Sequence, residues 1–347
     1  MSNLPAPARY VPYHDIGAAP HIVVDGKQQA ATTLTLSHWP WNSTPETLLR
    51  DTSTDIAFAY LKSPAFHNDS GIVSNSHYDE DGLLSMFALT NPAEAWAHKD
   101  WLIRTSYASD FWRCTDEDAA KLSFVLAAWT DPEVSPLPAD IFELPLRQKI
   151  IAEYRLMLEA LPGILSDPYK DEQFWQPEFQ FWQDSIAYID SGEVRLEEWP
   201  DLDTVVVRVP GDLPPQRIRR YLTHWELPVH PFAIFAKTNC SRVIWVHGQQ
   251  VSMQFRYESW VQVSSFKPQP RVDLQPLAEL LSELDGTDWQ FDGVHEVAAG
   301  LYRANEEAGS LAADEVLQAL AAFLKDAPPA WDPHGEPPEN LAKSGDE

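Results

Sequence analysis

Residues 71–90, G-I-V-S-N-S-H-Y-D-E-D-G-L-L-S-M-F-A-L-T, predict a short apolar strand, a polar loop and a helix that begins near Gly82. The loop contains His77, Asp79 and Asp81, and each of these side chains can give a lone pair to one cation. In α/β proteins, ligands and metals gather at the carboxyl ends of the strands. We therefore expect a divalent-metal site in this loop.

The same loop has a simpler interpretation. Asp and Gly before a helix commonly form a turn, and Asp79 or Asp81 alone could cap the helix without any metal. An EF-hand is excluded, because placing Gly82 at the sixth loop position puts Ala88 where the bidentate Glu belongs. The metal site and the helix cap both remain open.

The string H-Y-D-E-D-G after a strand resembles the first motif of the DHH phosphoesterase superfamily. That superfamily includes single-strand exonucleases, oligoribonucleases, cyclic-dinucleotide hydrolases and a class of pyrophosphatases. The resemblance implies that His77, Asp79 and Asp81 are catalytic residues that bind Mn²⁺, with Mg²⁺ as the second choice. It also implies that Asp110 completes the metal cluster. The D-H-H triplet that names the superfamily is absent from the chain.

A second stretch resembles the G-G-G-H-x-x-A-A-G signature in the substrate-binding domain of many DHH proteins. Residues 293–300, G-V-H-E-V-A-A-G, keep one glycine of the triplet. The resemblance implies that Gly293 and His295 hold a substrate phosphate. A helix that begins at Glu296 with small packing residues explains the string equally well, so both interpretations remain.

The chain as a whole is similar to an uncharacterised bacterial protein family. The similarity is carried by the His38 loop, the H-x-D-x-D-G loop, R-Y-E-S-W-V-Q at 256–262 and R-V-D-L at 271–274. It implies no established activity. Strand alternation within 256–262 places Arg256 and Glu258 on one face, where we expect a surface ion pair.

Three strand–loop–helix segments are predicted near the amino terminus, with strands at 32–36, 72–74 and 101–107. Such repetition favours a parallel sheet with helices packed on it. The three loops then open at one edge of the sheet and bring the candidate residues together, namely His38, His77, Asp79, Asp81 and Asp110. We assign His38 to substrate binding. Its alternative is simple packing between Trp39 and Trp41.

The predicted fold class is α/β, DHH-like, in four segments. Residues 1–135 form an α/β domain that carries the H-x-D-x-D-G loop, and 136–192 form a helical segment whose first helix ends before Pro162. Residues 193–326 form an α+β domain, since their pattern changes to alternating strands. The acidic, proline-rich residues 327–347 are expected to be disordered.

The composition of the chain excludes some classes of binding partner. The 347 residues carry 52 acidic and 25 basic side chains, a net charge of −27, and such a surface repels bulk duplex nucleic acid. A small phosphorylated substrate or a short oligonucleotide can still bind where divalent metals neutralise its charge. Two distant cysteines, no evident signal peptide and no membrane-length apolar run favour a cytoplasmic protein without a membrane partner.

Two functions follow from these observations. The first is a metal-dependent phosphoesterase that hydrolyses a phosphodiester or phosphomonoester of a nucleotide or short oligonucleotide through a metal-activated water. The alternative is a non-catalytic, acidic binding or regulatory protein in which the H-x-D-x-D-G loop is only a turn and helix cap.

Overall fold

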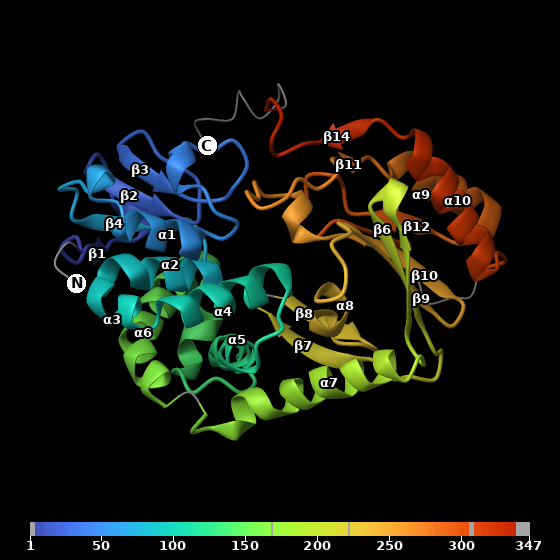
Figure 1. The fold of residues 1–347 in the computed structure, drawn as a ribbon, viewed down its shortest axis with the longest axis horizontal. Coiled ribbons are helices and arrows are strands. Elements are labelled where there is room, and N and C mark those ends of the chain that lie inside the picture. Colours follow the sequence, from blue (N-terminus) through green and yellow to red (C-terminus); the bar gives the residue numbers. More distant parts are fainter. Residues whose placement is uncertain (1–3, 168, 221–222, 305–308, 338–347) are drawn as a thin grey trace. The chain divides into compact units, whose positions relative to one another are not determined.

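The computed structural model describes residues 4–167, 169–220, 223–304 and 309–337 (Figure 1). The chain forms two compact units. Unit 1 comprises Met1–Trp182, Arg217–Glu226 and Val263–Ser265, and unit 2 comprises Gln183–Gln216, Leu227–Gln262 and Phe266–Glu347. The helices expected in the segment 136–192 therefore fall mostly in unit 1.

Unit 1 is built on a four-stranded sheet in the order β1-β4-β2-β3, whose paired strands are all parallel. These strands are β1 (Arg9–Tyr10), β2 (His21–Val24), β3 (Thr32–Leu36) and β4 (Ile72–Ser74). β2 is buried along its whole length, as expected for a central strand covered by helices. The predicted N-terminal parallel sheet is confirmed.

Seven α-helices lie between residues 53 and 190 of the described chain, and the first of them precedes β4. They are α1 (Ser53–Leu61), α2 (Glu80–Thr90), α3 (Pro92–Ala97), α4 (Lys99–Phe111), α5 (Glu117–Trp129), α6 (Leu146–Ser166) and α7 (Glu172–Asp190). α1 and α2 pack against each other, and their apolar side chains join those of β2, β3 and β4 in one core. This packing fixes the start of each helix near the carboxyl edge of the sheet.

Two predicted elements were wrong. The strand expected at 101–107 is part of α4, because Leu102, Thr105, Ser106 and Ser109 are buried at helical spacing. Three of these four residues are polar, so the period is hard to see in a hydrophobicity pattern. The end predicted before Pro162 was also wrong, since α6 continues through this proline to Ser166.

Unit 2 contains a six-stranded sheet in the order β12-β13-β10-β9-β6-β5. Its strands are β5 (Arg195–Trp199), β6 (Thr204–Val209), β9 (Arg242–His247), β10 (Gln250–Phe255), β12 (Trp289–Phe291) and β13 (Gly300–Arg303). The β6–β9 pair is parallel and the other pairs are antiparallel. Helices α9 (Gln275–Asp285) and α10 (Ala313–Asp326) share a core with this sheet (Figure 1).

Shorter elements complete the described chain. β7 (Gln216–Arg220) pairs with β8 (Thr223–Leu227), and α8 (Pro231–Phe235) follows. The prediction of disorder from residue 327 was wrong at its start, because β14 (Pro329–Trp331) pairs with β11 (Arg271–Val272) and Trp331 is buried. Residues 338–347 of the predicted tail lie outside the described residues.

Among the described residues, none of the helices has the length and apolarity needed to cross a bilayer.

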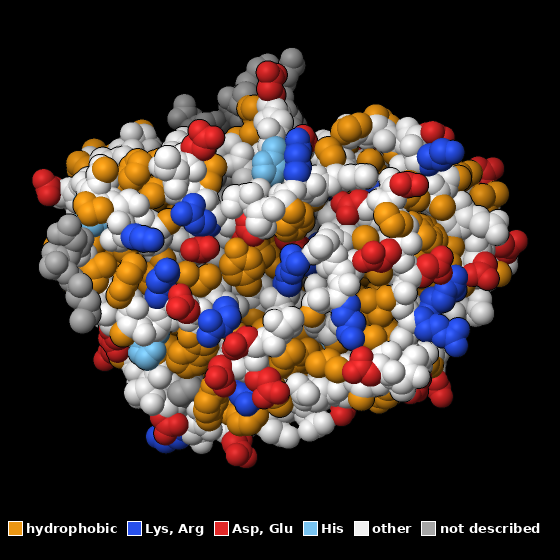
Figure 2. All heavy atoms as spheres, in the orientation of Figure 1, with side chains coloured by type: hydrophobic (Ala, Val, Ile, Leu, Met, Phe, Trp, Pro, Cys, Tyr) orange, Lys and Arg blue, Asp and Glu red, His pale blue; other side chains and the backbone are white. Residues whose placement is uncertain are grey.

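On the face shown in Figure 2, acidic side chains are interspersed with basic and apolar ones. The net negative charge is therefore spread over this face and does not form one acidic patch there.

Candidate metal centre

Three neighbouring strands of the parallel sheet end at the same edge, and a polar residue follows each of them. Asp25 comes directly after β2, and His38 lies two residues beyond β3. His77 and Asp79 lie in the loop after β4, and Asp81 is in the first turn of α2. The parallel topology therefore brings these five side chains from distant positions in sequence to one place.

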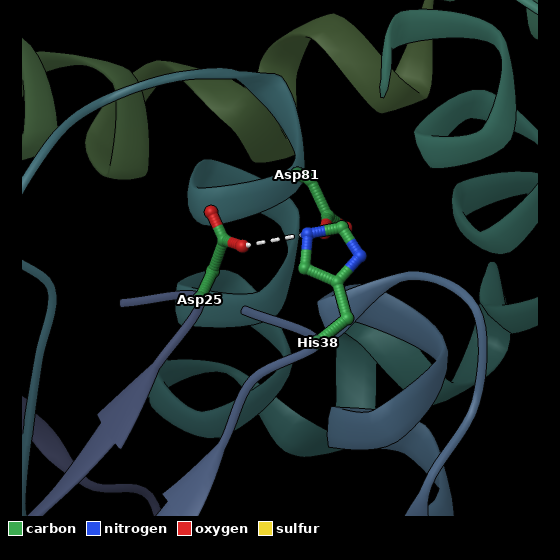
Figure 3. Close-up of side chains that lie close together, drawn as sticks. All are labelled: Asp25, His38 and Asp81. Carbon is green, nitrogen blue, oxygen red and sulfur yellow. Dashed lines mark ion pairs between the residues drawn. The ribbon is translucent and has the colours of Figure 1, made fainter. Parts of the chain in front are cut away.

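Asp25, His38 and Asp81 form an inner group that is buried (Figure 3). The Nε2 atom of His38 lies 3.4 Å from Oδ1 of Asp25 and 3.9 Å from Oδ2 of Asp81. Oδ1 of Asp25 also accepts a 2.8 Å hydrogen bond from the hydroxyl of Ser53, at the start of α1. The three candidate ligand atoms lie within 4.8 Å of one another.

Asp25, His77 and Asp79 form a second, outer group. The Nε2 atom of His77 lies 3.3 Å from Oδ2 of Asp25 and 3.0 Å from Oδ2 of Asp79. The side chains of His77 and Asp79 are each 28% exposed, whereas that of Asp25 is 1% exposed. The outer group is thus reachable from solvent while the inner group is enclosed.

Asp25 belongs to both groups and uses a different oxygen in each. Its Oδ1 faces His38 and its Oδ2 faces His77. Asp25 could therefore hold two metal ions, one with each oxygen. Asp25 was not among the predicted site residues.

The two predicted alternatives for the loop turn out to be compatible. Oδ1 of Asp79 accepts a hydrogen bond from the N–H of Gly82 and caps α2, while Oδ2 faces His77. The carboxylate of Asp81 accepts hydrogen bonds from the N–H groups of Ser53 and Thr54, the first residues of α1. Each carboxylate oxygen has a second lone pair, so these caps leave both residues able to bind a cation.

The orientation of the His38 ring is fixed by a hydrogen bond at its other nitrogen. Nδ1 donates to the main-chain oxygen of Asp51 over 2.6 Å, which leaves Nε2 directed at the carboxylates. Metal-binding histidines in proteins almost always have such a second contact. The ring of His77 packs against that of Trp39, with ring centroids 4.9 Å apart.

The candidate ligands strongly shift one another's pKa values. Burial lowers the pKa of His77, but the carboxylates of Asp79 and Asp25 outweigh burial and raise it to about 10. Burial and the charge of Asp25 raise the pKa of Asp81 to about 7. Burial favours the protonated form of Asp25, yet hydrogen bonds from His38 and His77 hold its pKa well below the usual range. Without a cation, this cluster has to hold protons.

Asp110 reaches the cluster from an unexpected element. It lies in the last turn of α4, and its Oδ2 is 3.6 Å from Nε2 of His38. Burial and the nearby charge of Asp81 raise the pKa of Asp110 well above its ordinary value. Asp110 therefore lies beside the other candidates, as expected, although it belongs to neither three-residue group. A helix positions it, and not the strand predicted at 101–107.

The predicted phosphate-binding residues Gly293 and His295 lie in unit 2 and belong to neither group. The helix expected from Glu296 is absent from the described residues there, where a turn leads to β13. Gly293 has a φ of 106°, which favours glycine, and His295 is exposed with its ring against Trp331.

The expected surface pair of Arg256 and Glu258 was wrong in its location. Both side chains are buried and form an ion pair with each other, because β10 ends at Phe255 and a 3-10 turn follows. Alternation beyond the end of the strand therefore predicted the wrong face.

The signal that could have identified Asp25 is H-I-V-V-D-G at 21–26. Its apolar run ends in Asp-Gly, a pair that is also typical of a simple turn. β4 is likewise a short apolar strand followed by a polar loop, which contains the candidates His77 and Asp79.

Comparison with known proteins assigns the chain to a family. The chain belongs to a family of unknown function, DUF6687, which matches residues 6–335. The predicted membership of an uncharacterised family is thereby confirmed. No curated protein and no solved structure matches the chain. The resemblance of the H-x-D-x-D-G loop to the DHH superfamily stays a prediction.

Proposed function

Because membership of this family assigns no activity, we propose from the geometry that the protein is a metal-dependent phosphoesterase with two metal ions. The observation that carries the proposal is the position of Asp25, whose two oxygens face His38 and His77 separately. A shared carboxylate between two histidine-containing groups suits two-metal hydrolysis of phosphate esters.

The distances within the two groups fit metal binding as well as hydrogen bonding. Two ligand atoms that each lie about 2.1 Å from one metal are about 3.0–3.4 Å apart at coordination angles of 90–109°. The N···O distances from His77 are 3.0 and 3.3 Å, and the distance from His38 to Asp25 is 3.4 Å. Only the 3.9 Å distance to Asp81 requires a shift of about half an ångström to fit this range.

The charges of the cluster also favour cations. Four carboxylates, from Asp25, Asp79, Asp81 and Asp110, surround two imidazoles. Even with both imidazoles protonated, four ionised carboxylates would leave a net charge of −2 in a largely buried site. Oxygen-rich sites with imidazole suit Mn²⁺, with Mg²⁺ as the second choice because it takes fewer nitrogen ligands.

Each candidate residue would have its own role in holding the metals. When bound, the metals lower the pKa of a water and stabilise charge on the phosphoryl group. Asp25, His38 and Asp81 would hold the enclosed position, and Asp51 would keep the ring of His38 oriented. His77 and Asp79, being partly exposed, would hold the position that substrate reaches.

The class of substrate follows from the resemblance and from charge. A DHH-like phosphoesterase would act on a phosphodiester or phosphomonoester of a nucleotide or short oligonucleotide. The chain lacks the D-H-H triplet, so further charge stabilisation has to come from other residues. His38 is buried beside Asp81, so in this proposal it helps to hold the enclosed cation and does not touch the substrate.

Metal content tests the proposal directly. We would purify the full chain without chelator, incubate it with Mn²⁺, and measure bound metal by elemental analysis. The expected result is about two ions per chain for the wild type, about one for Asp79→Asn, and close to none for Asp25→Asn, whose residue is shared by both groups. Asp131→Asn is the matched control, since Asp131 is a buried aspartate of unit 1 that pairs with arginines.

Two results would decide against the phosphoesterase. Absence of metal from the wild type after incubation would leave the acidic binding protein as the better account, with Asp79 and Asp81 acting only as helix caps. Equal metal loss in Asp79→Asn and Asp131→Asn would show that the losses come from damage to the fold. If two ions are bound, hydrolysis of phosphodiesters and short oligonucleotides is then measured with and without Mn²⁺.

A further inference from the structure

Helix α2 has no side chain at Gly82, where it runs beside Asp25 of the candidate metal centre. A Cβ atom there would lie 2.6 Å from Nδ2 of Asn75, 2.7 Å from the hydroxyl of Tyr154 and 3.1 Å from Oδ2 of Asp25. The three atoms come from distant parts of the chain, namely the end of β2, the loop after β4 and helix α6. Three polar groups therefore surround one point next to a candidate metal ligand.

Two of these groups are buried hydrogen-bond donors. Among the described residues, neither Nδ2 of Asn75 nor the hydroxyl of Tyr154 has a hydrogen-bond partner. The orientation of the Asn75 amide is fixed, because Oδ1 accepts a hydrogen bond from the N–H of His77 over 3.2 Å. Burying a donor without an acceptor costs stability, so a state of the site that pairs these two groups is favoured.

Asp25 offers the acceptor that the two donors need. Its Oδ1 accepts a hydrogen bond from Ser53, whereas Oδ2 points away from the inner group (Figure 3) and lies 3.3 Å from Nε2 of His77. A carboxylate oxygen has two lone pairs, so Oδ2 can bind a cation with one and accept a hydrogen bond with the other. Burial and the charges of Asp79 and Asp25 raise the pKa of Tyr154 well above its ordinary value, so its hydroxyl remains a donor.

We propose that Asn75 and Tyr154 are positioning residues of the outer group, which support Oδ2 of Asp25 through one hydrogen-bond chain when a cation is bound. In this chain, Nδ2 of Asn75 donates to the hydroxyl oxygen of Tyr154, and the hydroxyl donates to Asp25. A hydroxyl group both accepts and donates, so every member of the chain is paired. The proposal rests on the proposed function, because the outer cation is what the chain holds in place.

The chain matches what metal centres require of the residues around their ligands. Carboxylates that bind a metal are themselves hydrogen-bonded, and loss of such a contact weakens metal binding about 10–100-fold. Ser53 supplies this contact to Oδ1 of Asp25, and Tyr154 would supply it to Oδ2. The chain also connects the two outer ligands His77 and Asp25, since the amide of Asn75 contacts both ends of it. Small side-chain rotations close the chain, because all three atoms lie within 3.1 Å of one point.

Titration of the metal-free full chain with Mn²⁺, together with chemical denaturation without metal, tests this inference. Tyr154→Phe removes only the hydroxyl, and Asp79→Asn identifies the outer step of the titration. We expect Tyr154→Phe to weaken the outer ion about tenfold and to change the enclosed ion less than about twofold. The metal-free variant should be as stable as the wild type or more stable, because it loses an unpaired buried hydroxyl. A residue that only supports the fold would lower this stability.

Ser123→Ala is the matched control. Ser123 of α5 has a buried hydroxyl without a partner among the described residues, and it belongs to neither ligand group. Its replacement should not lower the stability and should leave both ions unchanged. Asn75→Ala should weaken the outer ion, and its combination with Tyr154→Phe should bind that ion no more weakly than the weaker single variant, as expected for members of one chain. If Asn75→Ala does not fold, the comparison of Tyr154→Phe with Ser123→Ala decides.

The outcomes separate this inference from the proposed function. Two ions in the wild type, bound with equal affinity by Tyr154→Phe, overturn the chain and leave the metal centre intact. Equal weakening of both ions overturns the assignment to the outer group. Lower metal-free stability of Tyr154→Phe also overturns the inference, because the hydroxyl would then have a partner without a cation. A wild type that binds no Mn²⁺ removes the proposed function and the chain with it.

Discussion

The main-chain oxygen of Asp51 accepts a 2.6 Å hydrogen bond from Nδ1 of His38, a candidate metal ligand. Through Asp51, His38 is connected to residues far away in sequence. The carboxylate of the same Asp51 accepts hydrogen bonds from the N–H and hydroxyl groups of Ser264 and Ser265. These serines belong to unit 1, although the chain on both sides of Val263–Ser265 belongs to unit 2. Asp51 is thus fixed at both its carbonyl and its side chain.

We predict that Asp51→Ala lowers the affinity for Mn²⁺ about tenfold, although Asp51 supplies no ligand to either group. The variant keeps the main-chain oxygen but loses the side-chain contacts that hold it in place. The double variant Ser264→Ala/Ser265→Ala retains both N–H donors and should lose less. Titration of metal-free protein with Mn²⁺ measures both, and unchanged affinity in Asp51→Ala would show that the His38 ring is oriented by other contacts.

Gly82→Ala should destabilise the protein, which reverses the usual effect of this substitution within a helix. A Cβ atom at Gly82 would lie 2.6 Å from Nδ2 of Asn75, 2.7 Å from the hydroxyl of Tyr154 and 3.1 Å from Oδ2 of Asp25. We expect a loss of about 1–3 kcal/mol in the free energy of unfolding and weaker metal binding.

The matched control for this prediction is Gly163→Ala in α6. A Cβ atom there meets nothing within 4 Å, so the variant should gain about 0.5–1 kcal/mol from helix propensity. Chemical denaturation of both variants measures the difference. A stabilised Gly82→Ala would mean that Asn75 and Tyr154 move away without cost.

Much of the candidate site follows from local sequence, because strand β4 and helix α2 are short, regular and adjacent in the chain. His77, Asp79 and Asp81 lie between them and could be identified as a group. His38 was found for the same reason, at the end of β3. Its role was less clear, since the contact of its Nδ1 with Asp51 is set by tertiary packing.

The parts that could not be predicted depend on long-range packing. Asp25 becomes central only because β2 lies between β3 and β4 in the sheet, an order that differs from the order in sequence. Asp110 approaches His38 from a helix in which half of the buried residues are Ser or Thr. Arg271 is fully buried, and nothing in the string R-V-D-L distinguishes it from an exposed arginine.

Arg271→Lys should destabilise unit 2 although it keeps the positive charge. The guanidinium donates hydrogen bonds to the main-chain oxygens of Glu296 at 2.6 Å and Val297 at 3.0 Å and to the hydroxyl of Ser259 at 2.8 Å. An ammonium group cannot reproduce this fan of donors, so we expect a loss of about 2–4 kcal/mol.

Hydrogen exchange and denaturation together check the Arg271 prediction. The amides of residues 294–297, which form the turn that carries His295, should exchange faster in Arg271→Lys. Arg195→Lys is the control, since Arg195 is an exposed residue of β5 and its replacement should change stability by less than about 0.5 kcal/mol. Unchanged exchange in the turn would show that Arg271 does not hold it.

Asp285 should make the stability of unit 2 sensitive to acid. Burial raises the pKa of its carboxyl, but hydrogen bonds from the N–H of Leu311 and the side chains of Trp289 and Arg303 outweigh burial and lower it to about 2. A depressed folded-state pKa contributes stability that is complete above the unfolded value of about 3.9 and is lost as pH falls through about 2. The shift corresponds to a stabilisation of about 2 kcal/mol.

We therefore expect Asp285→Asn to lose about 2 kcal/mol of unfolding free energy at pH 7 and to show a flatter stability profile between pH 4 and pH 2 than the wild type. Asp288→Asn removes the same charge from an exposed residue that contacts only Gln290 through its side chain among the described residues, so it serves as the control. Denaturant midpoints measured across this pH range give both quantities. Parallel profiles for Asp285→Asn and the wild type would show that the hydrogen bonds to Leu311, Trp289 and Arg303 do not favour the ionised carboxylate.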